Sequence, residues 1–189
     1  ESISKTKLKE AVAVLRQGGV VLFPTETSYG IAADATNPRA VWKVAKMKAR
    51  TSEKTFPLIV SSTAMANRYG HLRCLGHRLA QAYWPGPLTL IVEVRKGTDL
   101  ARDVVGKDGT IAIRVSANET ARALSRGLGR PIVSTSANRA GEPAAFAVSD
   151  VDLKADFILD AGRLPKRKPS TIARIVGGEI EILRQGSVK

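Results

Sequence analysis

The chain has 189 residues, 43% of them hydrophobic, which is enough for one sizeable core and too short for two domains of ordinary size. We therefore expect a single domain over residues 1–189. Its 30 Lys and Arg residues outnumber the 17 Asp and Glu residues, and the net charge of +13 favours anionic partners: nucleotides, nucleic acids or acidic membranes. A single cysteine excludes an internal disulfide and a metal cluster built from cysteines.

The hydropathy and the start of the chain bear on its location. No apolar run approaches the roughly 18 residues of a membrane-spanning helix. The residues that follow Glu1 lack the apolar stretch of a secretory signal. We expect a cytoplasmic protein with no membrane partner. Cys74 fits a reducing compartment, and its side chain is predicted to be a small buried hydrophobe.

Helices are predicted where apolar residues recur every three or four positions, and strands where short apolar runs or alternation occur. In chain order we expect a helix over 8–16, a strand over 20–23, a helix from Asn37-Pro38 to about Lys48, a strand over 58–60, two helices within 64–83 that break near Gly70, a rigid turn over 84–87, strands over 88–94 and 110–115, a helix over 120–126, and strands over 131–133, 157–159, 170–176 and 179–183. The last two should form a hairpin. This interleaving predicts an α/β fold with a twisted, mixed sheet flanked by helices.

The usual nucleotide-binding signatures are absent, since the sequence has neither a P-loop motif nor a Rossmann fingerprint. Candidate site residues lie instead within strands or at their ends. Alternation along residues 110–115 sends Ile111 and Ile113 to the core and Arg114 to the opposite face. An arginine within a strand loses hydration, so either an internal carboxylate or a phosphate or carboxylate of a ligand should meet it.

Short polar side chains occur at two further strand ends. Ser134 and Ser136 should share a face in Ser134-Thr-Ser-Ala-Asn138, where they suit close approach to a ligand, although such residues also form ordinary turns and helix caps. Thr25 and Thr27 should project together if the chain after the strand of 20–23 stays extended. Gly30 would then let the backbone turn.

Two cations lie at the end of the second predicted helix. Lys48 continues the apolar stripe of Val41 and Val44, so its ammonium should emerge at the rim of the core, with Arg50 nearby. The helix dipole alone also favours basic residues at this end. Together these positions predict one basic, concave anion-binding cleft. Its chemistry would depend on positioning and charge neutralisation, because nothing in the sequence resembles an activated nucleophile.

Seven segments occur in a fixed order across nearly the whole chain: Pro24-Thr-Glu-Thr-x-Tyr-Gly30, Lys48-x-Arg50, Trp84-Pro-Gly-Pro-Leu-Thr89, Ile111-Ala-Ile-Arg114, Ser134-Thr-Ser-Ala-Asn138, Pro169-Ser-Thr-Ile172 and Leu183-Arg-Gln-Gly186. They resemble the motifs of YrdC-type threonylcarbamoyl-AMP synthases in their short, single-domain form. The resemblance implies a YrdC-like fold and an L-threonylcarbamoyladenylate synthase, a nucleotidyltransferase. Such an enzyme joins L-threonine, bicarbonate or carbon dioxide, and ATP into threonylcarbamoyl-AMP and pyrophosphate, for the threonylcarbamoyladenosine (t6A) modification of tRNA at position 37.

The resemblance also implies roles for individual residues. Threonine would be held by Thr25, Thr27, Arg114 and Ser134, and ATP by Lys48, Arg50, Lys54, Thr110, Ser136, Asn138 and Arg184; Lys48 and Arg50 would also act as the catalytic cations. Mg²⁺ would be carried with ATP and held mostly by the phosphates, because the sequence has no carboxylate cage for a metal. Besides ATP, L-threonine and bicarbonate, the candidate partners are tRNA and the downstream threonylcarbamoyl-transferase complex.

Two alternatives remain open. Segment 51–61 departs from the family pattern, being longer before Pro57 and having Ser61 where some relatives have histidine, which leaves room for a paralogue that forms an adenylate from carbamoyl phosphate. The second alternative is a tRNA-binding or double-stranded-RNA-binding module, suggested by the net charge and the run Lys166-Arg-Lys168. Residues 162–169 are predicted to be a solvated, proline-flanked surface loop.

Overall fold

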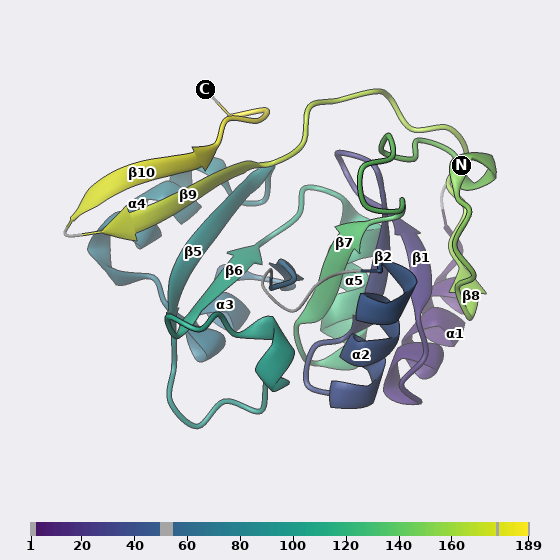
Figure 1. Cartoon of the computed structure of the whole chain (residues 1–189), viewed down its shortest axis with the longest axis horizontal. Coiled ribbons are helices and arrows are strands. Elements are labelled where there is room, and N and C mark those ends of the chain that lie inside the picture. Colours follow the sequence, from purple (N-terminus) through teal and green to yellow (C-terminus); the bar gives the residue numbers. More distant parts are fainter. Residues whose placement is uncertain (1–2, 50–54, 177, 189) are drawn as a thin grey trace.

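The computed structural model describes residues 3–49, 55–176 and 178–188 (Figure 1). Its α-helices are α1 (Lys5–Arg16), α2 (Pro38–Met47), α3 (Thr63–Tyr69), α4 (Arg73–Tyr83) and α5 (Glu119–Leu128), and short 3₁₀ turns span Arg102–Val104 and Val148–Asp150. Its strands are β1 (Val21–Pro24), β2 (Tyr29–Asp34), β3 (Leu58–Ile59), β4 (Gly70–His71), β5 (Leu88–Val94), β6 (Thr110–Arg114), β7 (Ile132–Ser136), β8 (Phe157–Ile158), β9 (Thr171–Val176) and β10 (Glu179–Arg184).

The strands of the described residues join one ten-stranded sheet. Its order is β10-β9-β5-β6-β3-β7-β2-β1-β8, and β4 pairs with β5 beside this path. The β1–β2 and β5–β6 pairs are antiparallel, whereas β3–β6 and β5–β9 are parallel. The predicted α/β fold with a mixed sheet is therefore confirmed, as is the terminal β9–β10 hairpin. Figure 1 shows this hairpin at one side of the molecule and β1 and β2 at the other.

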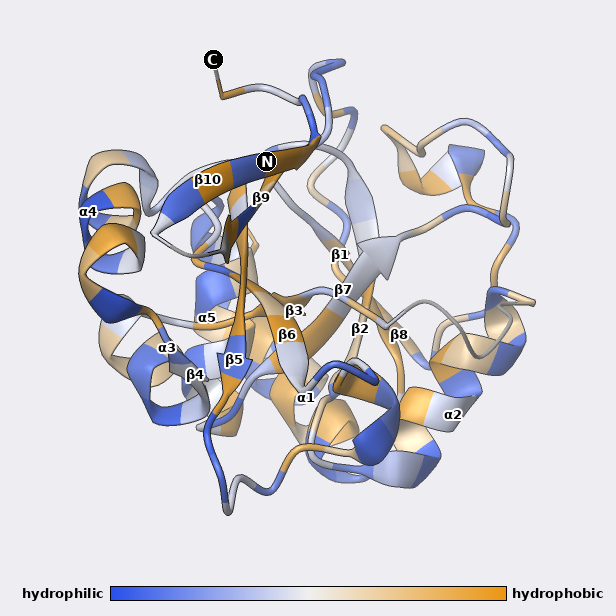
Figure 2. Cartoon of the chain, turned by 60° about the vertical axis from the view of Figure 1, so that its left-hand side comes forward, coloured by the Kyte–Doolittle hydropathy of each residue, from blue (hydrophilic) through white to orange (hydrophobic). Residues whose placement is uncertain are grey.

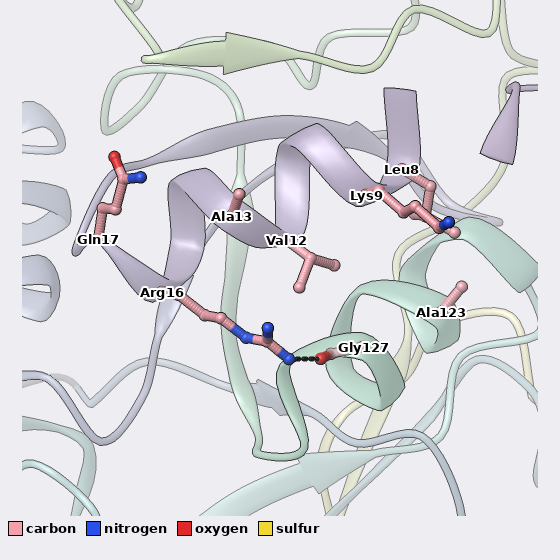
Figure 3. A pocket seen from close by; sticks show the side chains of 8 residues that line it. All are labelled: Leu8, Lys9, Val12, Ala13, Arg16, Gln17, Ala123 and Gly127. Atoms are coloured by element: carbon pink, nitrogen blue, oxygen red, sulfur yellow. Dashed lines mark hydrogen bonds between the residues drawn. The ribbon is translucent and has the colours of Figure 1, made fainter. Parts of the chain in front are cut away.

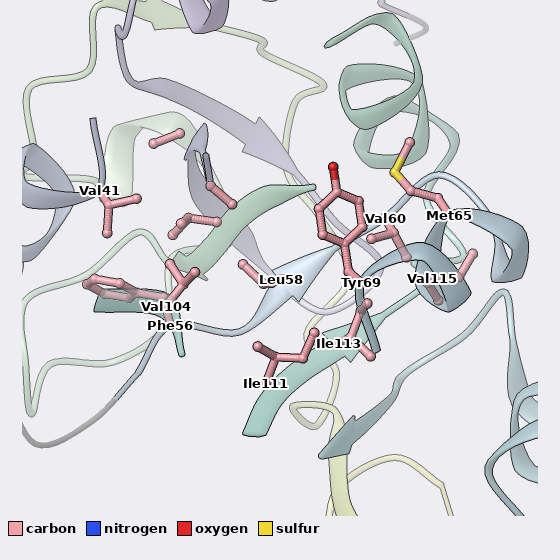
Figure 4. Close-up of a cluster of buried hydrophobic side chains, with 14 of the residues drawn as sticks. Val41, Phe56, Leu58, Val60, Met65, Tyr69, Val104, Ile111, Ile113 and Val115 are labelled. Atoms are coloured by element: carbon pink, nitrogen blue, oxygen red, sulfur yellow. The ribbon is translucent and has the colours of Figure 1, made fainter. Parts of the chain in front are cut away.

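Apolar side chains form a cluster on each face of the sheet. Leu58 and Ile59 are neighbours in β3 and belong to different clusters, because successive strand residues point to opposite faces. The smaller cluster contains Leu15 of α1 and Leu124 of α5. The larger one contains Ile111 and the side chains around it in Figure 4. Figure 2 shows a hydropathy pattern that agrees with these clusters: the inner strands are mostly apolar, and the helices have polar residues on their outer sides.

The chain between β1 and β2 differs from the expected one. It does not stay extended after β1, because the Thr25 hydroxyl accepts hydrogen bonds from the backbone N–H groups of Thr27 (3.1 Å) and Ser28 (3.2 Å) and closes a tight turn. The condition of an extended chain is therefore not met, yet the Thr25 and Thr27 hydroxyl oxygens still lie 3.0 Å apart. Strand β2 follows at once and pairs with β1. All six of its residues are buried, so it has no polar–apolar alternation that could reveal a strand.

Gly30 also has a different role from the expected one. It lies within β2, opposite Phe23 of β1. A Cβ atom at this position would come within 3.1 Å of the Phe23 ring and 3.2 Å of the carbonyl oxygen of Thr135. Glycine is therefore needed here for close packing between strands, and the backbone does not turn at this residue.

Helix α2 begins and ends as its sequence indicates. The Asn37 side chain caps it by accepting hydrogen bonds from the N–H groups of Arg39 (3.0 Å) and Ala40 (3.3 Å), and Pro38 occupies its first turn. Lys48 is its C-cap residue.

The prediction that Cys74 is buried was wrong. Its side chain is exposed, because it lies on the outer side of α4, whose buried residues are Gly76 and Ala80. Within the described residues, no helix is both long and apolar enough to cross a bilayer.

Candidate functional site

The turn between β1 and β2 lies against the end of β7. The backbone N–H of Ala137 donates to the carbonyl oxygen of Tyr29 (3.0 Å), and Gly30 pairs with Ser136. Thr25 is buried, and its hydroxyl donates to the carbonyl oxygen of Ser28 (2.7 Å). Its oxygen also lies 3.0 Å from the hydroxyl oxygen of Thr27, which is half-buried. The hydrogen bonds of Thr25 thus shape the turn that carries Thr27 to the strand end.

Lys48 connects α2 to the chain that follows β7. Its side chain is buried, and its ammonium donates to the carbonyl oxygen of Ser136 (2.7 Å), to the carbonyl oxygen of Asn138 and to Asn138 Oδ1 (3.2 Å). The predicted emergence of this ammonium at the rim of the core is confirmed. Three of the predicted ATP-binding residues, Lys48, Ser136 and Asn138, therefore lie together. The ammonium orients the loop that carries the other two.

Arg114 at the end of β6 forms a buried ion pair. Its Nη1 lies 2.8 Å from Glu26 Oε1, and the two side chains are 9% and 8% exposed. The other carboxylate oxygen of Glu26 accepts a hydrogen bond from the Ser116 hydroxyl. Burial lowers the pKa of the Arg114 guanidinium, and the charge of Glu26 opposes that shift. An internal carboxylate, one of the two partners expected for this arginine, is therefore present.

Arg184 at the end of β10 is a second guanidinium close to the first. The β5–β6 register pairs Leu90 with Ile113, so Thr89 is next to Arg114. The Thr89 hydroxyl oxygen lies 3.0 Å from that of Ser170, which accepts a hydrogen bond from Arg184 Nη2 (2.9 Å). Burial, and then the positive charge of Arg114, lower the pKa of the Arg184 guanidinium. The two cations are therefore near enough to repel each other.

The turn between β1 and β2 connects the two groups of residues. It carries Glu26, which binds Arg114, and it continues into β2, which pairs with β7 beside Ser136. The structure thus brings Thr25, Thr27, Lys48, Arg114, Ser136, Asn138 and Arg184 into one connected region. Ser134 is buried in β7, two residues before Ser136 on the same face.

Of the predicted site residues that the structure describes, Thr110 stands apart from this region. Thr110 lies at the other end of β6 from Arg114, about 13 Å away along the strand. Its hydroxyl donates to Asp108 Oδ1 (2.7 Å), so its proposed contact with the nucleotide stays a prediction. Arg50 and Lys54 lie outside the described residues.

The described residues offer no protein cage for a metal ion. Among them, no group of three or more His, Cys, Asp or Glu side chains could hold one. Glu26, the carboxylate nearest the two guanidiniums, has both oxygens engaged by Arg114 and Ser116. The Mg²⁺ ion expected with ATP stays a prediction.

Two cavities are lined by residues other than the predicted ones. One, of about 460 Å³, is between α1 and α5 and includes Val12 and Arg16 in its wall; Arg16 Nη2 donates to the carbonyl oxygen of Gly127 (2.6 Å) across it (Figure 3). The other, of about 450 Å³, borders Lys46 and Arg139. Neither is lined by a predicted site residue, so the basic concave cleft stays a prediction.

Sequence reasoning missed Glu26, Ser116 and Ser170. Glu26 stands within the quoted motif Pro24-Thr-Glu-Thr-x-Tyr-Gly30, and a carboxylate between two threonines was a signal that could have been used. Ser116 follows β6 by two residues, and Ser170 precedes β9. The Ser116 hydroxyl donates to Glu26, and the Ser170 hydroxyl accepts from Arg184. Both contacts join distant parts of the chain, which local sequence patterns do not reveal.

Solved structures of similar proteins share this fold. The variant H234A/Y235A of P. abyssi Sua5 superposes with a TM-score of 0.92 at 30% identity, and Sua5 complexed with L-threonine superposes with a TM-score of 0.91 at 30% identity. Each match covers 98% of this chain and only 58% or 56% of Sua5, so the chain spans little more than half of that protein. E. coli YciO, at 24% identity, has a TM-score of 0.86 over 98% of this chain and 92% of its own, which shows the fold alone.

Sequence comparison leads to the same group of proteins. A putative threonylcarbamoyl-AMP synthase of Methanocaldococcus jannaschii is 33% identical over 175 residues, which are 90% of this chain and 81% of the relative. The family model of Sua5, YciO and YrdC, described as "Telomere recombination", matches residues 13–186. Since that match includes all the strands and nearly every helix, the chain belongs to the Sua5/YciO/YrdC family.

Proposed function

We propose that this protein forms threonylcarbamoyl-AMP and pyrophosphate from L-threonine, bicarbonate or carbon dioxide, and ATP. The observation that carries the proposal is the pair of neighbouring guanidiniums, Arg114 and Arg184, of which Arg114 alone is paired with a carboxylate, that of Glu26, within the described residues. Within the described residues no carboxylate pairs with Arg184, whose guanidinium donates only to Ser170. A guanidinium that lies beside another guanidinium and has no carboxylate partner is stabilised by an anionic substrate.

The chemistry of the reaction suits such a site. The threonine amine takes up carbon dioxide to give a carbamate, and a carbamate oxygen then attacks the α-phosphate of ATP and displaces pyrophosphate. Threonine, the carbamate and ATP all carry negative charge, so cations that hold them together lower the repulsion between the reacting groups. Mg²⁺ bound through the phosphates would supply further neutralisation.

Relatives support both substrates. The M. jannaschii protein is described as a putative threonylcarbamoyl-AMP synthase, and P. abyssi Sua5 has been solved with L-threonine. In this chain, the turn with Thr27 and the guanidinium of Arg114 are linked directly by Glu26, which suits an amino acid held by its hydroxyl side and its carboxylate. The group of Lys48, Ser136 and Asn138 lies next to that turn, where ATP would be bound.

We place this step in the cytoplasmic route to t6A at position 37 of tRNA, with the downstream threonylcarbamoyl-transferase complex as the acceptor of the product. The loop over 162–169 is largely exposed, including Lys166, Arg167 and Lys168. It is attached at both ends, since the Tyr29 hydroxyl donates to the carbonyl oxygen of Gly162 (2.7 Å) and the Ser187 hydroxyl to that of Lys168 (2.7 Å). This basic loop would face tRNA if the protein contacts it.

Pyrophosphate release from ATP should require both threonine and bicarbonate. We expect that omitting either one reduces release to the background rate, because neither alone provides the carbamate nucleophile. The measurement is a coupled pyrophosphate assay with four mixtures: complete, without threonine, without bicarbonate, and with carbamoyl phosphate in place of both. Pyrophosphate release without threonine that equals release in the complete mixture would contradict the proposal. Release that needs carbamoyl phosphate would identify the carbamoyl-adenylate alternative.

A further inference from the structure

We propose that Glu26 is a positioning residue for the amino-acid substrate, an inference that rests on the function proposed above. Glu26 would hold the Arg114 guanidinium in the orientation that receives the substrate carboxylate. It would also keep that guanidinium at a fixed distance from Thr27, which follows Glu26 in the same turn. Glu26 itself would not touch the reacting atoms.

The first support is that the Glu26 carboxylate is held from both sides. Oε1 accepts from Arg114 Nη1 at 2.8 Å, and Oε2 accepts from the Ser116 hydroxyl. Ser116 is fixed in turn, because its hydroxyl oxygen accepts from the N–H of Asn118 (3.1 Å), the residue that caps α5. The carboxylate is thereby joined to the start of a helix, and its side chain is 8% exposed. A group held in this way can orient a neighbour reproducibly.

The second support is that Glu26 binds only one nitrogen of the Arg114 guanidinium, Nη1. Within the described residues, Glu26 is the only hydrogen-bond partner of the guanidinium, through Nη1. No nitrogen of Arg114 in this part of the chain is both unpaired and sealed from solvent. The remaining nitrogens therefore keep some exposed area, although the side chain as a whole is only 9% exposed. A guanidinium can pair with a carboxylate through two parallel N–H groups. One edge is held by the protein, and the other is available to a ligand.

The third support is electrostatic. Without Glu26, two neighbouring guanidiniums would have no internal counter-charge within the described residues, and Arg114 would be pushed away from Arg184. With Glu26 in place, one net positive charge remains for the substrate. The opposite reading is that Glu26 competes with the substrate for Arg114 and has to leave. The two readings predict opposite changes in the KM for threonine when the carboxylate is removed.

The test compares Glu26→Gln with the wild type in the pyrophosphate assay. Glu26→Gln keeps the size of the side chain and removes its charge. We expect the KM for threonine to rise about tenfold or more, the KM for ATP to stay within about twofold, and kcat to fall less than the KM for threonine rises. Ser116→Ala keeps the charge of Glu26 but removes the hydrogen bond that holds its carboxylate. It should raise the KM for threonine by a smaller factor. Glu93→Gln makes the same chemical change in the exposed pair with Arg73 and should leave all three constants unchanged.

Each outcome decides the question. A wild type without threonine-dependent turnover would overturn the proposed function, and this inference with it. An active wild type whose Glu26→Gln variant keeps its KM for threonine within about twofold would overturn the inference alone. So would a lower KM for threonine, which would show competition, or equal rises in the KM values for threonine and ATP, which would show a general structural defect.

Discussion

Arg114→Ala is expected to abolish threonine-dependent pyrophosphate release. The change removes the buried cation that would bind the substrate carboxylate, and it leaves Glu26 as a buried charge whose remaining partner is the Ser116 hydroxyl. Removing one partner of a buried ion pair costs about 3–5 kcal/mol of folding stability. The variant should therefore lose both activity and stability, as measured by the pyrophosphate assay and by urea unfolding.

A double variant separates these two losses. In Arg114→Met with Glu26→Gln both charges are absent, so no buried charge is left uncompensated. We expect most of the folding stability to return, because the effects of directly paired residues are not additive. The activity should stay absent. Recovered turnover in the double variant would show that Arg114 acts only through stability, and it would contradict its assignment to the substrate.

Lys48→Met is expected to lower kcat by about 100-fold or more. The ammonium donates to Ser136 and Asn138, so its loss would displace the loop proposed to bind ATP and remove a cation beside the phosphates. The carbonyl oxygens left behind would also cost about 1–3 kcal/mol of stability. Steady-state kinetics and urea unfolding of the same preparation measure both effects.

Lys46→Met is the matched control for this change. Lys46 is exposed two residues earlier in α2, and its ammonium lies over the Trp42 ring at 5.2 Å from the centroid. Its substitution should leave kcat within about twofold, because within the described residues no hydrogen bond joins its side chain to Ser136 or Asn138. Equal losses in the two variants would show that overall basic charge matters more than the position of Lys48.

Much of the fold could be predicted from local patterns. Alternation in β6 placed Ile111 and Ile113 in the core and Arg114 on the other face, and the structure has this arrangement. Asn37-Pro38 marked the start of α2 correctly. Strand β2 could not be found in this way, because it is buried over its full length and follows a turn formed by a single threonine hydroxyl. Periodicity does not distinguish such a strand from any other short apolar run.

The sequence predicted which residues belong to the candidate site better than it predicted the contacts between them. Sequence indicated that Lys48, Arg114 and the hydroxyls near Ser136 belong together, and the structure brings them into one connected region. It could not show that Glu26 in the turn pairs with Arg114, because these two residues are 88 positions apart in the chain. It also could not show that Arg184 approaches Arg114, since that contact depends on the register of β5, β6, β9 and β10.

The most direct test of the proposed function is mass spectrometry of the product formed from ATP, bicarbonate and isotopically labelled threonine. The account predicts a threonylcarbamoyl-AMP ion that carries the full label of threonine, and no such ion when bicarbonate is removed. A product of ATP without the threonine label, or an adenylate that forms only from carbamoyl phosphate, would contradict it.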